Sequence, residues 1–180
     1  AKPSKAIIKL ALPATLALLA KAVYNIVDTA YIGMLKDDIA LTAVGVTVPL
    51  LLIMVSIENI FAAGAAVLAG RQLGAKDEDG ASRTVTTIIG LSIVIGAILC
   101  VGGIVFIEPL MRAFGAYEAS LPLAKDYAFW MFVAALANLP AQSMNCAARA
   151  ESSVKISSIA VITGALLNVV LDPVFMFDWG

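Results

Sequence analysis

Two aspartates of this sequence lie inside long apolar stretches, where a charged side chain is costly. Asp28 stands eight residues before Lys36, and Asp172 stands six residues before Asp178. An ionisable group in the middle of a membrane-spanning helix costs about 2.5–3.5 kcal/mol on insertion scales, so it faces other helices or water instead of lipid. We therefore take Asp28 and Asp172 as the first candidates for function.

Each aspartate has a polar neighbour one helical turn earlier. Tyr24 precedes Asp28 by four residues and Asn168 precedes Asp172 by four, so each pair shares a helix face. Pro173 lacks a backbone donor and leaves the carbonyl group at position 169 without its helical partner. Carboxylate, amide and carbonyl oxygens suit Na⁺, whereas apolar surroundings favour the protonated carboxyl group of a proton carrier. The spacing thus predicts a site for Na⁺ or H⁺.

A polar stripe is predicted in another apolar stretch. Asn138, Gln142 and Asn145 follow one another at intervals of four and three residues, which places them on one helix face. The alternative role of such groups is to join helices by hydrogen bonds, and it applies most to Asn25, Asn138 and Gln142. It applies less to the aspartates, because asparagine would join helices equally well without a charge.

Two further charged residues, Lys21 and Glu58, also lie within apolar stretches. Lys21 precedes Asp28 by seven residues and is nearly on its face, so it could reach that carboxylate or extend toward the membrane surface. Glu58 could pair with Lys21. Both are predicted modulators of the ion site.

The composition excludes several classes of protein. Of the 180 residues, 61% are hydrophobic and 14% are charged, which leaves too little polar surface for a water-soluble domain. The net charge of -1 gives no signal for nucleic-acid binding, and the absence of histidine removes the commonest general base and metal ligand. We therefore expect no enzymatic activity, no cofactor other than a coupling ion, and no nucleic-acid partner.

Five apolar segments are predicted to be membrane-spanning helices that form an all-α bundle. Each reaches the roughly 20 residues that a helix needs to cross the hydrocarbon core, and none alternates in polarity as barrel strands do. The segments cover residues 6–35, 39–70, 84–107, 127–148 and 156–177. The connection from Glu108 to Asp126 has room for a short interfacial helix. A close-packing face is predicted at four small residues spaced by four: Ala62, Ala66, Gly70 and Gly74.

The distribution of lysine and arginine predicts the orientation in the membrane. If all five segments cross, the N-terminal arm and the connections on its side of the membrane carry eight positive residues. The connections on the opposite side carry three. The positive-inside rule then places the N-terminus in the cytoplasm. The larger set consists of Lys2, Lys5, Lys9, Arg71, Lys76, Arg83, Arg149 and Lys155, and the smaller one of Lys36, Arg112 and Lys125.

Four stretches of the chain resemble the multidrug and toxic compound extrusion (MATE) transporters, in the order of that family. They are Leu12-Pro13 with Tyr24 to Gly33, Gly74 to Asp77, Asn145 to Arg149, and Leu167 to Phe175. The resemblance implies a twelve-helix antiporter with two six-helix lobes and a central cavity. Residues 1–180 would then be part of the N-terminal lobe, with helix six and the C-terminal lobe absent.

The resemblance also implies a cation site on helices one and five. Asp28 matches the aspartate of that site on helix one, and Asn168 and Asp172 match its asparagine and aspartate on helix five. Tyr24 and Asn145 would lie beside them. Pro13 matches a proline associated with bending of helix one, and Pro173 is the second candidate for helix bending.

The function that we expect on this basis is cation-coupled export of small organic, often cationic, compounds across a prokaryotic inner membrane. The lipid bilayer, the substrate and the second lobe of the same chain would be the partners. One alternative is a lipid-linked saccharide flippase of the same superfamily, in which we would expect arginines in the cavity. The other is a membrane subunit without transport activity, whose aspartates would be replaceable.

Overall fold

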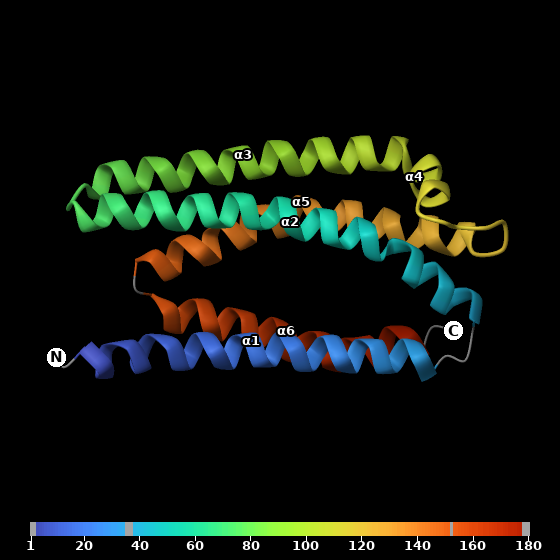
Figure 1. The fold of residues 1–180 in the computed structure, drawn as a ribbon, viewed down its shortest axis with the longest axis horizontal. Coiled ribbons are helices and arrows are strands. Elements are labelled where there is room, and N and C mark those ends of the chain that lie inside the picture. Colours follow the sequence, from blue (N-terminus) through green and yellow to red (C-terminus); the bar gives the residue numbers. More distant parts are fainter. Residues whose placement is uncertain (1–2, 35–37, 152, 178–180) are drawn as a thin grey trace. The chain divides into compact units, whose positions relative to one another are not determined.

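The regular structure of the described chain consists of α-helices. The computed structural model describes residues 3–34, 38–151 and 153–177; the side chains at 3–10, 14, 25, 29, 32, 172, 173 and 175–177 are outside that description. Six helices follow one another along the sequence: α1 (Pro3–Met34), α2 (Asp38–Gly74), α3 (Glu78–Val105), α4 (Ile107–Ala113), α5 (Leu121–Ala150) and α6 (Val154–Phe177) (Figure 1). Each predicted segment overlaps one long helix, and α4 lies in the connection where a short helix was predicted.

Four of the helices, α1, α2, α3 and α6, are long and apolar enough to cross a membrane, judged on the described residues by length and composition. The predicted segment 127–148 lies in α5, which is not among the four. The polar residues Asn138, Gln142 and Asn145 lower the mean hydropathy of α5, which also carries Lys125 and Asp126 near its start. The fold class predicted from the sequence, an all-α membrane protein, is confirmed.

The chain divides into two compact units. The first combines residues 1–36 with residues 151–180, and the second comprises residues 37–150. In the first unit, α1 packs along α6 although the two helices stand at opposite ends of the sequence. The two helices run in the same direction (Figure 1).

The packed face of α1 is a narrow stripe of small and polar residues. Ala17 is buried, and Pro13, Ala20, Tyr24 and Val27 are half-buried. Their spacing of three and four residues matches the seam of two helices that pack side by side. On α6 a corresponding stripe is formed by Val154, Ser158, Val161 and Ala165, of which all but the half-buried Val161 are buried.

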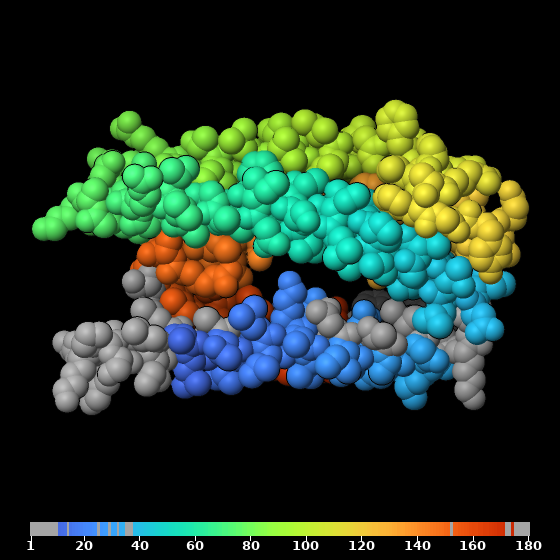
Figure 2. Space-filling view, viewed as in Figure 1, coloured from blue at the N-terminus to red at the C-terminus, as the bar shows by residue number. Residues whose placement is uncertain are grey.

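In the second unit, α5 packs against α2, α3 and α4. The helices α2 and α5 run in the same direction, and α3 runs against both (Figure 1). The core of this unit includes Leu50 and Met54 from α2, Met111 from α4, and Phe132 and Leu139 from α5. Large apolar side chains of α2, among them Leu52, Ile60 and Val67, are exposed, as expected where lipid is the solvent. Figure 2 shows α2 at the surface of this unit.

Candidate functional site

The candidate site is built on the face of α1 that packs against α6. Tyr24 and Asp28 are both half-buried and lie one turn apart on this face. Tyr31, three positions after Asp28, is also half-buried and continues the stripe. Asp28 is therefore partly shielded by the protein, as an ionisable group in an apolar helix is expected to be.

The register of α1 and α6 brings the predicted aspartate positions to a similar level. Pro13 of α1 and Ser158 of α6 line the same groove between the two helices. Because both helices run in the same direction and rise about 1.5 Å per residue, fifteen further residues lead to Asp28 on α1 and to Pro173, next to Asp172, on α6. The helix positions of Asp28 and Asp172 thus lie at about the same distance from this groove.

The residues predicted on α6 are described only in part. Asn168 lies within α6 and its side chain is exposed. The side chains of Asn25, Asp172 and Pro173 lie outside those that the structure describes, so the roles given to them remain predictions. Pro13 is half-buried within α1, which continues through it as a helix from Pro3 to Met34.

The remaining predicted residues are divided between the two units. Lys21 is exposed on α1, in the first unit. Asn145 on α5 and Glu58 on α2 are half-buried and belong to the second unit. Glu58 follows the buried Met54 by four residues and precedes the buried Ala62 by four, so it lies on the buried stripe of α2. The pairing of Glu58 with Lys21 and the place of Asn145 beside Asp28 remain predictions.

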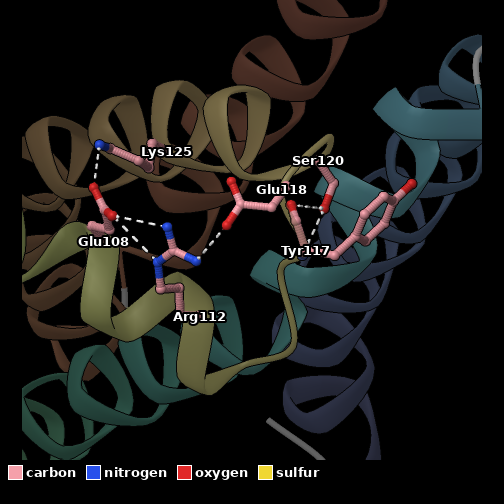
Figure 3. A network of polar contacts seen from close by, with 6 residues as sticks. All are labelled: Glu108, Arg112, Tyr117, Glu118, Ser120 and Lys125. Atoms are coloured by element: carbon pink, nitrogen blue, oxygen red, sulfur yellow. Dashed lines mark hydrogen bonds and ion pairs between the residues drawn. The ribbon is translucent and has the colours of Figure 1, made fainter.

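A charged network that the sequence analysis missed ties α4 to α5 (Figure 3). The Glu108 carboxylate accepts from Lys125 Nζ at 2.9 Å and from Arg112 Nη2 at 3.2 Å, and Arg112 Nη1 donates to Glu118 at 3.2 Å. Hydrogen bonds from Lys125 and then Arg112 lower the pKa of Glu108, and Glu118 and Glu108 raise the pKa of Arg112. The four-residue spacing of Glu108 and Arg112 was the available signal, because such pairs meet on a helix.

A buried hydroxyl pair joins α3 to α5. Ser92 Oγ and Ser143 Oγ lie 3.0 Å apart, and both side chains are buried. Each hydroxyl also lies within hydrogen-bonding distance of a carbonyl one turn earlier, Ile88 at 2.8 Å and Leu139 at 3.0 Å. Since each serine has one hydroxyl hydrogen, one serine donates to its carbonyl while the other donates to its partner.

Comparison with known proteins identifies a family over most of the chain. The family model named MatE matches residues 13–174. The multidrug export protein MepA of Staphylococcus aureus is 29% identical over 175 residues, which are 97% of this chain and 39% of that protein. The FAD transporter of Shewanella oneidensis is 28% identical over 176 residues, again 39% of its length. The chain therefore spans about two fifths of the curated relatives that it matches.

A solved structure has the same fold and is also matched over about two fifths of its length. A MATE protein crystallised in complex with MaD3S superposes on this chain with a TM-score of 0.95 and 27% sequence identity. The match covers 100% of this chain and 40% of that one.

Proposed function

The chain belongs to the MatE family, and we propose that it forms part of a cation-coupled transporter that exports small organic compounds. The observation that carries the proposal is the position of Asp28 and Tyr24 on the face of α1 that packs against α6. A half-buried carboxylate within an apolar helix is costly unless it is used. The similarity to a multidrug export protein supports the same function.

In the proposed mechanism, Na⁺ or H⁺ binds at Asp28, Asp172 and Asn168, with Tyr24 and Asn145 nearby. Neutralising the carboxylates removes the cost of charge between the helices and changes how α1 packs against α6. Rocking of two lobes about a central cavity then exposes the substrate to alternate sides of the membrane. Lys21 and Glu58 adjust the affinity for the ion in this scheme.

The proposed setting is the inner membrane of a prokaryote with the N-terminus in the cytoplasm. The partners are the lipid bilayer, the exported compound and a second, C-terminal lobe. We propose a cationic or amphiphilic organic compound as substrate, and FAD belongs in the same assay because a relative of similar identity is named as an FAD transporter.

The test is ion-driven efflux of a cationic dye by the full-length protein carrying Asp28→Asn or Asp172→Asn. Loss of a charged ligand to the ion is worth about 1.5–3 kcal/mol, so each change should lower ion-driven efflux by about tenfold or more. Asp126→Asn is the matched control, because Asp126 is an exposed aspartate in the first turns of α5.

Two results would contradict the proposal. If both variants retain full efflux and unchanged cation binding, the aspartates are not the coupling site. If no organic compound moves in response to a Na⁺ or H⁺ gradient, the protein is better explained as a lipid-linked saccharide flippase or a subunit without transport activity.

A further inference from the structure

A shallow groove lies between α1 and α6, at the end of the pair where α6 begins. Its volume is about 200 Å³. Leu12, Pro13 and Leu16 form the α1 wall, and Lys155, Ile159 and Ile162 form most of the α6 wall. Both walls belong to one compact unit, so the groove is a property of this helix pair.

The walls of the groove are apolar and accessible. Leu12, Leu16 and Ile159 are 58%, 50% and 63% exposed. A cavity of about 150 Å³ lined by such side chains is large enough to bind benzene, so this groove has room for an apolar segment of similar size. Part of an acyl chain lying along the helices would bury these side chains.

Charge distinguishes this groove from a plain apolar seam. Among the described residues that line it, Lys155 is the only charged one. It lies in the first turn of α6 and is exposed, so its methylene groups can line the groove while its ammonium group stays at the membrane surface. An apolar groove that ends at an ammonium group is complementary to an anion that carries an acyl chain.

We propose that this groove binds an anionic phospholipid, with an acyl chain between α1 and α6 and the headgroup phosphate on Lys155. The predicted orientation places the first turn of α6 at the cytoplasmic surface, where basic sites between membrane helices bind anionic headgroups. Because the groove lies beside Pro13 on the same helix as Asp28, a bound lipid would hold α1 and α6 together below the ion site. The binding of lipid does not depend on the proposed transport function.

The experiment measures lipid binding by the protein purified in detergent. Phosphatidylglycerol and phosphatidylcholine with the same acyl chains are titrated, and binding is followed by native mass spectrometry and by the thermal unfolding midpoint. We expect phosphatidylglycerol to bind more tightly and to raise the midpoint further. Lys155→Gln should weaken the binding of phosphatidylglycerol by about fivefold, the effect of one basic residue near an anionic surface. It should weaken the binding of phosphatidylcholine less, because the choline ammonium group offsets the charge of that lipid's phosphate.

Two matched controls separate the groove from the general surface. Leu16→Trp fills the groove and should weaken the binding of both lipids. Leu91→Trp on α3 lies outside the groove and should not weaken it; the two positions are matched because Leu16 and Leu91 are each 50% exposed. Arg83→Gln removes an exposed charge on α3, outside the groove, and should have little effect. The proposal is overturned if both lipids bind equally, if Arg83→Gln weakens phosphatidylglycerol as much as Lys155→Gln, or if Leu16→Trp changes nothing.

Discussion

Polar side chains inside these helices must find their partners within the protein, because hydrocarbon offers no hydrogen bonds. Ser92 and Ser143 meet this requirement because one serine donates to the other between α3 and α5, and the second donates to a carbonyl group of its own helix. Asp28 and Tyr24 lie on the packed face of α1 for the same physical reason. The cost of an unpaired polar group in lipid therefore determines on which helix face a polar side chain lies.

Removing the serine pair should weaken the contact between α3 and α5 by a small, measurable amount. Hydrogen bonds between membrane helices average about 0.6 kcal/mol and reach about 1.7 kcal/mol. We expect a coupling energy in that range from a double-mutant cycle of Ser92→Ala and Ser143→Ala, measured by unfolding in mixed detergent micelles. Ser56→Ala is the control, because the exposed Ser56 donates to the Leu52 carbonyl of its own helix. Additive effects of the two changes would show that the serines do not interact.

The network around Glu108 should make stability depend on pH. Lys125 and Arg112 lower the pKa of Glu108 in the folded protein. The contribution of Glu108 is therefore complete above the pKa it has in the unfolded chain, near 4.5, and is lost as the pH falls through its lower, folded pKa. We expect Glu108→Gln to reduce the thermal unfolding midpoint at neutral pH, with a difference from the unchanged protein that shrinks on acidification.

The matched control for this pH effect is Glu118→Gln. Glu118 contacts Arg112 at 3.2 Å, but its side chain is 89% exposed, so its removal should change the midpoint less. If the difference between Glu108→Gln and the unchanged protein is the same at pH 3 and pH 7, the ion pairs do not stabilise the fold.

At the scale of elements, close packing of α3 on α5 depends on small residues. A β-carbon at Gly96 would lie 3.1 Å from the Ala135 carbonyl oxygen and 3.3 Å from Leu136 Cα. A β-carbon at Gly103, seven residues later, would overlap the ring of Phe132. Phe132 is itself in the core of the second unit, so its ring has little room to move.

Gly103→Ala should therefore destabilise the protein, by about 1–3 kcal/mol if the packing cannot adjust. Gly102→Ala is a precise control, because a β-carbon at Gly102 meets nothing within 4 Å and alanine favours a helix by about 1 kcal/mol over glycine. The two neighbouring substitutions should change the free energy of unfolding in opposite directions. Equal effects of both would mean that the contact between Gly103 and Phe132 is not tight.

The packing face of α2 shows how far sequence spacing can be used. The stripe predicted at Ala62, Ala66, Gly70 and Gly74 begins correctly, since Ala62 is buried, but Ala66 and Gly70 are half-buried and Gly74 is exposed. A strict four-residue spacing rotates about 40° per step around a helix of 3.6 residues per turn. The buried face instead continues through Ala65 and Ala69, at alternating intervals of three and four.

The pattern of apolar residues could not predict which helices pack against each other. In a soluble protein the buried face of a helix is apolar and the other face is polar. Here both the lipid-facing and the protein-facing sides are apolar, so hydrophobicity predicts the helices but not their partners. The all-helical membrane fold could be predicted from apolar length, and the half-buried positions of Asp28 and Tyr24 from the cost of polar groups in lipid. The network at Glu108 depends on the fold of the chain between α4 and α5.

At the scale of the whole molecule, the first and last helices form one unit and the four helices between them form another. Residues far apart in the sequence thus supply the two walls of one helix pair. Parallel direction is essential for the proposed ion site, because only a parallel pair brings the positions of Asp28 and Asp172 to the same level. An antiparallel pair with the same groove would separate them by the length of the helices.

This register can be tested directly by cross-linking. Leu16 and Ile162 line the same groove, so Leu16→Cys with Ile162→Cys should be joined by a short bismaleimide once Cys100 and Cys146 are replaced by alanine. Val174 lies twelve residues further along α6, about 18 Å at the helical rise, and Leu16→Cys with Val174→Cys should therefore remain unlinked. Linked peptides are identified by mass spectrometry after digestion. If the second pair is linked and the first is not, α1 and α6 are displaced or reversed, and Asp28 and Asp172 do not share a level at which one ion could bind both.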